Sequence, residues 1–363
     1  MLADERRARL RRAMEEAGIE ALVLYGNAWQ GDYLRYAADF GILEGHGIAL
    51  VTADGAAELY LDSAVEAERA EAETAGLAVR LAPDIARGVG ARLDRIANSR
   101  VAAAPRRFLP GWLAERARGF TLEDGTALVD RLLMHKLPGE VEAIRRAAAL
   151  ADSAYGVFRE AARPGRHQYE LCGDVEAYLR GQGCADNFMI IGSGGRDVLG
   201  MTPPSDRRIA PGDLVTTELT PAVEGYYAQI CRTLVTGKAS DAQRRAFAVY
   251  LEALEAGVAA VRPGATAADV ARAENDVFRK HGLGEYVTDR YTRVRGHGLG
   301  LFADSKPHIL ENVDTVLEPG MALVVHPNTY HPEVGYMVLG DAVIVTERGA
   351  DVLIRTPRTL FEE

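Results

Sequence analysis

Two segments of similar pattern, RPGRHQYELCGDVEAYLRGQG (residues 163–183) and RPGATAADVARAENDVFRKHG (residues 262–282), decide the architecture of this chain. Each begins with Arg-Pro-Gly, which ends a preceding helical pattern, continues as a second helical pattern and closes on glycine. A strand-like stretch follows each segment. This repetition at a fixed offset predicts two related α+β halves within one domain, and any functional site is expected between the halves.

The residues before this repeat follow a different pattern. Strand-like runs at 20–26, 47–53 and 57–63 alternate with helical runs, as is typical of an α/β domain. The stretch MHKLPGE (134–140) interrupts this alternation, and a long amphipathic helical pattern begins at its end. We therefore predict a smaller N-terminal α/β domain over residues 1–133 and a second domain over residues 134–363.

Composition limits the classes of partner. The 363 residues suffice for two hydrophobic cores, and the net charge of −10 argues against nucleic acid or an anionic membrane, which select basic surfaces. No apolar run is long enough to span a membrane. The three cysteines have no metal-ligand or CxxC spacing, a usage typical of a reducing compartment. We expect a cytoplasmic protein.

The stretch TELTPAVEGYYAQICRTL (217–234) predicts two paired strands joined by a turn. Glu218 lies near the start of the first strand, and alternation puts Tyr227, Gln229 and Cys231 on one face of the second. Cys231 fits either an activated thiolate beside a histidine or a small buried apolar residue. A carboxylate and a neutral amide on one hairpin indicate a polar site.

Two histidines occupy notable positions. His297 lies between glycines in VRGHGLG (294–300), where a ligand can approach closely, although a histidine hydrogen-bonded inside a turn has the same pattern. His326 closes the apolar strand of LEPGMALVVHPN (317–328) and fits either a hydrogen-bonded strand end or a ligand. The sequence contains no GxSxG, P-loop or HExxH motif, which argues against serine hydrolases, NTPases and zincins.

These segments together resemble the creatinase/aminopeptidase P/methionine aminopeptidase family, which has the "pita-bread" fold. The resemblance implies a C-terminal pita-bread domain with pseudo-twofold halves and a smaller N-terminal creatinase-type domain. In relatives that smaller domain often helps to form a dimer, so a homodimer is expected. Besides the two repeats, the motifs in family order are PPSDRRIAPGDLV (203–215), GHGLGL (296–301), LEPGM (317–321) and GDAVIVTERG (340–349).

The resemblance also indicates where metal ions would bind. In the family's metallopeptidases, two aspartates on the hairpin, one histidine and two glutamates hold two metal ions. Their counterparts here are, in order, Glu218, Gln229, His297, His326 and Gly340. Gln229 and Gly340 supply no anionic ligand, whereas a dinuclear site needs bridging carboxylates. We therefore predict that the chain is not a working two-metal aminopeptidase and has no cofactor.

Two further positions depart from the family pattern. Met201 stands where relatives have a substrate-facing histidine, and Asp304 stands where they have the histidine after the GHG motif. In creatinase the functional histidine corresponds to Met201, and the glutamate on the same hairpin corresponds to Cys231. These differences argue against creatine as the substrate.

Three functions remain open. The first is metal-independent hydrolysis of a C–N bond in a small amide, amidine or imide, with His297 or His326 as proton shuttle and Glu218 as its partner. The second is a single divalent ion held by Glu218, His297 and His326, or an Xaa-Pro-type peptidase. The third is ligand binding without catalysis. The expected substrate-binding residues are Gln229, Tyr227, Met201, Cys231 and Asp304.

Overall fold

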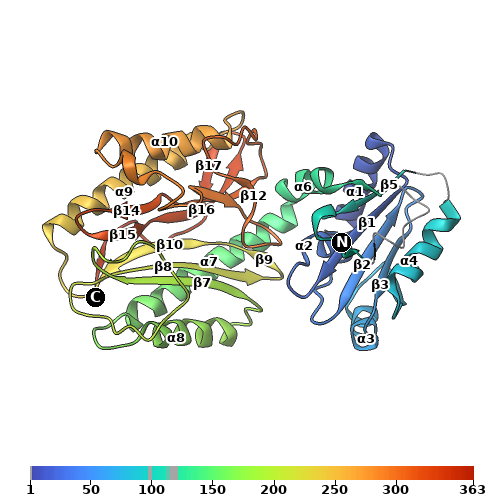
Figure 1. The fold of residues 1–363 in the computed structure, drawn as a ribbon, viewed down its shortest axis with the longest axis horizontal. Coiled ribbons are helices and arrows are strands. Elements are labelled where there is room, and N and C mark those ends of the chain that lie inside the picture. Colours follow the sequence, from blue (N-terminus) through green and yellow to red (C-terminus); the bar gives the residue numbers. More distant parts are fainter. Residues whose placement is uncertain (1, 97–99, 112, 114–121) are drawn as a thin grey trace. The chain divides into compact units, whose positions relative to one another are not determined.

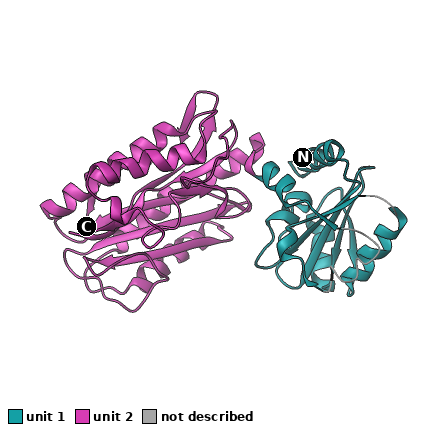
Figure 2. Cartoon of the chain, turned by 45° about the horizontal axis from the view of Figure 1, so that its top comes forward, with its two compact units in different colours: residues 1–133 teal, residues 134–363 magenta. Residues whose placement is uncertain are grey.

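The computed structural model describes residues 2–96, 100–111, 113 and 122–363. The chain forms two compact units, Met1–Leu133 and Met134–Glu363, each with its own sheet (Figure 2). In the described part of the chain, no helix has the length and apolar character needed to cross a membrane.

The first unit is an α/β domain around a six-stranded sheet with the strand order β4-β3-β2-β1-β5-β6. Its core packs apolar side chains of the central strands against one face of α4. The strands are β1 (Ala21–Asn27), β2 (His46–Thr52), β3 (Ala57–Leu61), β4 (Ala78–Leu81), β5 (Val101–Ala104) and β6 (Leu122–Asp124). The helices are α1 (Leu2–Ala17), α2 (Asp32–Ala38), α3 (Ala64–Glu73), α4 (Ile85–Leu93), α6 (Thr126–Met134), η1 (Asp94–Ile96) and η2 (Arg106–Phe108).

The second unit contains a larger sheet whose main order is β12-β11-β13-β16-β10-β8-β7. The strands of this unit are β7 (Asn187–Gly194), β8 (Leu214–Val223), β9 (Tyr226–Tyr227), β10 (Ile230–Val235), β11 (Gly296–Gly298), β12 (Ser305–His308), β13 (Ala322–Val325), β14 (Asn328–His331), β15 (Gly335–Val338), β16 (Gly340–Thr346), β17 (Gly349–Val352) and β18 (Phe361–Glu362). Of these, β14 and β15 pair with each other in a separate two-stranded sheet. Its helices are α7 (Pro138–Ala161), α8 (Gln168–Gly181), α9 (Asp241–Ala260), α10 (Ala267–Lys280) and η3 (Gly284–Tyr286).

The predicted repeat appears as two helix pairs. The pair α7–α8 packs along β7 and β8, and the pair α9–α10 packs in the other half of the sheet (Figure 1). The second helix of each pair has 14 residues and follows an Arg-Pro-Gly turn. Gly165 and Gly264 have φ values of +89° and +81°, which only glycine adopts without strain. The same local chemistry therefore ends the first helix in both halves.

The predicted hairpin is also present. Glu224 and Gly225 have φ values of 51° and 81°, as a two-residue type I′ turn requires. Glu218 on β8 lies opposite Cys231 on β10, and Ile190 on β7 lies opposite Glu218. Directly paired residues point to the same face of a sheet, so these side chains form one row across three strands.

The two histidines reach that same face from the other half. Leu323 and Val325 of β13 belong to the apolar core formed with α9 and α10. Alternation therefore turns Val324 and His326 to the opposite face. His297 on β11 lies opposite Val324, so it shares this face. The sheet thus brings the hairpin and both histidines to the face away from the helix pair.

Candidate functional site

A pocket of about 540 Å³ opens on this face of the second unit. Most of the predicted site residues line it, although they come from separate strands and loops. Those residues are Met201, Glu218, Gln229, His297, Asp304 and His326. The volume is in the range of pockets that hold a small molecule.

Two predicted substrate-binding residues do not line this pocket. Tyr227 lies near the hairpin turn, where its hydroxyl donates to the Asp186 carboxylate and its N–H donates to the Gly300 carbonyl at 2.8 Å. Cys231 is fully buried, and its sulfur accepts a hydrogen bond from Gln229 Nε2 at 3.3 Å. Burial and the charge of Glu218 raise the pKa of the Cys231 thiol, which supports the buried apolar role and not an activated thiolate.

Glu218 is the buried acid of the pocket. Burial, assisted by the negative charge of Asp304, raises the pKa of its carboxyl to about 7, while a hydrogen bond with Gln229 opposes the shift. Glu218 and Gln229 are diagonal neighbours on the hairpin, which explains how the amide reaches the carboxyl. A carboxyl with this pKa can both donate and accept a proton near neutral pH.

The two histidine rings lie close together, with centroids 5.3 Å apart and planes at 66°. Burial, together with the charge of His297, lowers the pKa of His326 to about 3. Burial also lowers the pKa of His297, although the carboxylate of Asp304 opposes this shift. His297 Nδ1–H donates to the Gly298 carbonyl at 3.0 Å, so its Nε2 is the proton acceptor. Both imidazoles are therefore neutral near pH 7.

Asp304 is a fixed anion at the edge of the pocket. Burial raises the pKa of its carboxyl, but the hydrogen bond from His308 and the charges of His297 and Arg293 outweigh burial and leave the pKa lowered. His308 Nε2 lies 3.0 Å from one carboxylate oxygen, and His297 Nδ1 lies 4.0 Å from the same oxygen. A proton taken up by His297 would be stabilised by this charge.

The residues at the expected metal positions do not fit a pair of ions. A Cβ atom at Gly340 would lie 2.5 Å from His326 Cβ and 2.9 Å from His326 Cα, so no carboxylate side chain fits there. Asp341 cannot substitute, because it faces the other side of the sheet. Its oxygens lie 2.8 Å from Arg232 Nη2 and 2.6 Å from Arg358 Nε.

The single-ion alternative also lacks support from the geometry. Glu218, His297 and His326 line one pocket, but among residues 2–96, 100–111, 113 and 122–363 no three His, Cys, Asp or Glu are placed to hold a metal ion. His326 Nδ1 is buried and has no hydrogen-bond partner within these ranges.

Sequence patterns missed part of the pocket. Tyr336, Asn328 and residues 289–294 line it, as do Leu199 and Phe302. The loop segments have no periodicity or motif that would mark them, because their position depends on tertiary packing. Tyr336 is a buried residue of β15, and strand patterns alone do not distinguish it from a core tyrosine.

Comparisons with known proteins agree with the fold. A model of metallopeptidase family M24 matches residues 142–347, and a creatinase/prolidase N-terminal domain model matches residues 6–134. An uncharacterized peptidase, YqhT, of Bacillus subtilis is 32% identical over 235 residues, 64% of this chain and 65% of that protein. The Xaa-Pro dipeptidase of Pyrococcus furiosus is 32% identical over 236 residues, 64% of this chain and 67% of that protein. The chain thus spans about two thirds of these curated relatives.

Solved structures match over nearly the whole chain. The Xaa-Pro dipeptidase from Bacillus anthracis has a TM-score of 0.86 and 28% identity, covering 99% of this chain and 100% of that chain. The X-Pro aminopeptidase from Thermotoga maritima, at 22% identity, has the same fold, with a TM-score of 0.87 and coverage of 98% and 99%. The predicted pita-bread fold with a creatinase-type N-terminal domain is confirmed. The chain belongs to metallopeptidase family M24.

Proposed function

We propose that the second unit hydrolyses a C–N bond in a small peptide-like amide by acid–base chemistry of its own side chains. The observation that carries the proposal is the pairing of Glu218, whose pKa is about 7, with two neutral imidazoles in one pocket. Groups with displaced pKa values in one pocket are the usual components of proton transfer.

The roles follow from the local charges. His297 Nε2 accepts a proton from water while the water oxygen bonds to the amide carbon, and Asp304 stabilises the resulting imidazolium. Protonated Glu218 donates to the departing nitrogen as the C–N bond breaks, and the proton on His297 then restores the acid. The pKa of about 3 makes His326 too weak a base for the first step, so His297 is the proposed shuttle.

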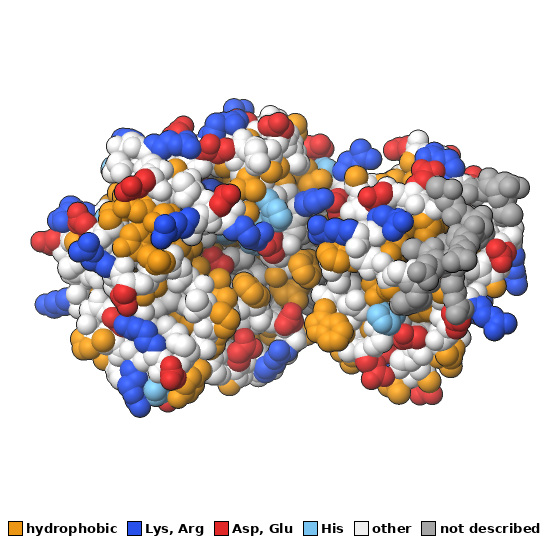
Figure 3. Space-filling model, viewed as in Figure 1, with side chains coloured by type: hydrophobic (Ala, Val, Ile, Leu, Met, Phe, Trp, Pro, Cys, Tyr) orange, Lys and Arg blue, Asp and Glu red, His pale blue; other side chains and the backbone are white. Residues whose placement is uncertain are grey.

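The surface is compatible with a small substrate. On the face drawn in Figure 3, Lys and Arg side chains are interspersed with Asp and Glu. This distribution differs from the basic stripe that nucleic acid selects. The pocket of about 540 Å³ supports a small molecule as the substrate.

Xaa-Pro dipeptidase activity is the second candidate, and the names of the relatives from Pyrococcus furiosus and Bacillus anthracis favour it. In this candidate reaction, the cleaved bond is the peptide bond before a proline residue. Without paired metal ions, the same acid–base residues would have to carry this cleavage.

The test is a hydrolysis panel of Xaa-Pro dipeptides, primary amides, cyclic imides and amidines, with and without EDTA. We expect EDTA-insensitive turnover of at least one class, lost in His297→Asn and retained in His281→Asn, a surface control whose ring pairs with Glu252. Turnover that needs added metal would contradict the proposal. Ligand binding without any turnover would support the non-catalytic alternative.

A further inference from the structure

Tyr336 has a buried side chain whose hydroxyl is left without a partner. The residue is 5% exposed and lines the pocket that contains Glu218 and His297. Among the residues that the structure describes, none forms a hydrogen bond with this hydroxyl. A buried tyrosine normally bonds its hydroxyl to a neighbouring group, as buried Tyr250 does with the Thr329 carbonyl at 2.8 Å. We therefore expect the missing partner of Tyr336 to be a ligand in the pocket.

The backbone around Tyr336 is held against the loop between β7 and β8. The N–H of Tyr336 donates to the Val198 carbonyl at 3.0 Å. Gly335, the residue before it, has a φ of +98°, and a Cβ atom there would lie 2.0 Å from the Gly195 carbonyl oxygen. The start of β15 thus touches the loop at a position that only glycine fits.

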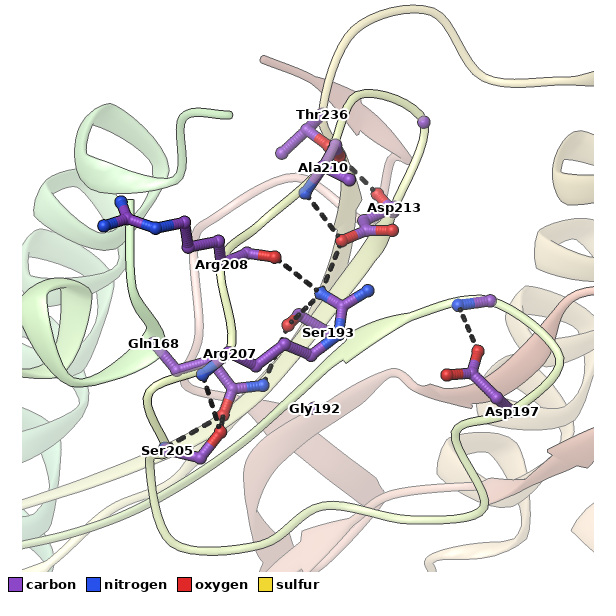
Figure 4. Close-up of polar contacts among 12 residues, drawn as sticks. Gln168, Gly192, Ser193, Asp197, Ser205, Arg207, Arg208, Ala210, Asp213 and Thr236 are labelled. Carbon is purple, nitrogen blue, oxygen red and sulfur yellow. Dashed lines mark hydrogen bonds and ion pairs between the residues drawn. The ribbon is translucent and has the colours of Figure 1, made fainter. Parts of the chain in front are cut away.

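Hydrogen bonds at the base of that loop anchor it in turn (Figure 4). Gln168 Nε2 donates to Ser193 Oγ at 2.8 Å, and Gln168 Oε1 accepts from the N–H and hydroxyl of Ser205 at 3.0 and 2.8 Å. Arg207 Nη1 donates to the same Ser193 oxygen at 2.9 Å. The loop that Tyr336 bonds to is therefore tied to α8 and β7. A donor oriented in this way before the reaction is the kind that stabilises developing charge well.

The proposed hydrolysis leaves one charge without a stabilising group. As the water oxygen bonds to the amide carbon, an electron pair of the C=O bond moves to the carbonyl oxygen, which becomes an oxyanion. His297 holds the proton from water and Glu218 donates to the departing nitrogen, so neither group serves that oxygen. Burial and the negative charge of Glu218 raise the pKa of Tyr336, so its hydroxyl keeps its proton and stays a donor near neutral pH.

We propose that Tyr336 is a catalytic residue whose hydroxyl donates a hydrogen bond to the carbonyl oxygen of the substrate and a stronger one to the oxyanion formed from it. The bond strengthens because hydrogen bonds to charged acceptors are roughly twice as strong as those between neutral groups. When the C–N bond breaks, the oxygen returns its electron pair to carbon and Tyr336 retains its proton. This inference rests on the proposed function for the reaction, whereas the donor itself follows from the unpartnered hydroxyl in the pocket.

The first experiment is Tyr336→Phe, which removes the hydroxyl and keeps the ring. On an amide that the hydrolysis panel identifies, its kcat should fall by about 100- to 1000-fold, as for the loss of one oxyanion donor, with little change in KM. Urea unfolding should show no loss of stability, because the hydroxyl has no partner in the folded protein. Tyr250→Phe is the matched control outside the pocket. It breaks the bond to the Thr329 carbonyl, so it should lower stability and leave kcat unchanged.

The second experiment measures the donor without turnover. Calorimetry on the full chain at pH 6 compares butylphosphonate, which has a tetrahedral anionic head, with butanamide, whose carbonyl is neutral. Tyr336→Phe should weaken binding of the phosphonate by about tenfold or more and binding of the amide by less than about fivefold. A general disruption of the pocket would weaken both ligands equally.

The outcomes separate this inference from the proposed function. Selective loss of phosphonate binding in Tyr336→Phe, without hydrolysis of any amide by the parent chain, supports the donor and fails the proposed function. Three results would overturn the role of Tyr336: hydrolysis with an unchanged kcat in Tyr336→Phe, equal weakening of both ligands, or no binding of the phosphonate to the parent chain. A loss of stability in Tyr336→Phe as large as that in Tyr250→Phe would also contradict it, since it would show that the hydroxyl has a structural partner.

Discussion

Replacing Glu218 by Gln should change the pH dependence of stability in an unusual direction. The pKa of this carboxyl is raised from 4.5 to about 7, mainly by burial. Below pH 4.5 the group is protonated in the folded and unfolded states, so the variant should resemble the parent chain. As the pH rises towards 7, the unfolded state releases a proton that the folded state retains, and the folded parent chain loses stability.

The size of this loss follows from the shift. A difference of about 2.5 pKa units, at about 1.36 kcal/mol per unit, corresponds to a loss of about 3 kcal/mol by pH 8. Glutamine cannot ionise, so Glu218→Gln should be the more stable protein at pH 8 by about this amount. The pKa values of the buried His297 and His326 are lowered, so the folded protein loses stability as the pH falls and these imidazoles become protonated in the unfolded state. The parent chain and the variant share this contribution, so it cancels in the difference between their unfolding free energies.

Urea unfolding at pH 4, 6 and 8, followed by circular dichroism, measures the difference. Tryptophan fluorescence identifies the transition of the first unit, because Trp29 and Trp112 both precede residue 134. Glu255→Gln, the same change at an exposed position of α9, is the matched control and should show no pH-dependent difference. A free-energy difference between Glu218→Gln and the parent chain that stays constant from pH 4 to pH 8 would refute the raised pKa and the acid role of Glu218.

Two further substitutions test the packing at Gly340 and the structural role of Asp341, the two features that leave no carboxylate ligand at this end of β16. Gly340→Ala should destabilise the second unit by about 1–3 kcal/mol, because the new methyl lies 2.5 Å from His326 Cβ, whereas Gly181→Ala, with nothing within 4 Å, should not. Calorimetry that finds both variants equally stable would contradict this packing. Asp341→Asn should cost about 3 kcal/mol or more, since Arg232 is fully buried beside it, and denaturant unfolding with no measurable loss would contradict the structural role of Asp341.

Local sequence patterns were sufficient to predict the two helix pairs and the boundary between the two units. The Arg-Pro-Gly turns favour glycine with positive φ, and the structure has that conformation at Gly165 and Gly264. The two units observed, Met1–Leu133 and Met134–Glu363, follow from the same change of pattern at the MHKLPGE stretch.

The site was only partly predictable. Strand alternation brings Glu218 and Gln229 together because both lie on one hairpin face, but it could not show that Tyr227, four residues from Cys231, is too far along the hairpin to reach the pocket. Leu199 lines the pocket on a loop that the backbone pair of Ile191 and Thr202 holds against β7, and sequence spacing does not encode such contacts. The binding of substrate by the predicted residues that line the pocket stays a prediction.

Metal content and hydrolysis rate, measured on one purified sample, test whether the pocket works without metal ions. We expect no stoichiometric pair of divalent ions, a rate of C–N hydrolysis that EDTA leaves unchanged, and no increase in rate on adding Mn²⁺. The physical reason is that Gln229 and Gly340 provide no carboxylates to offset two dications. Two bound ions per chain together with Mn²⁺-dependent cleavage of Xaa-Pro dipeptides would contradict it.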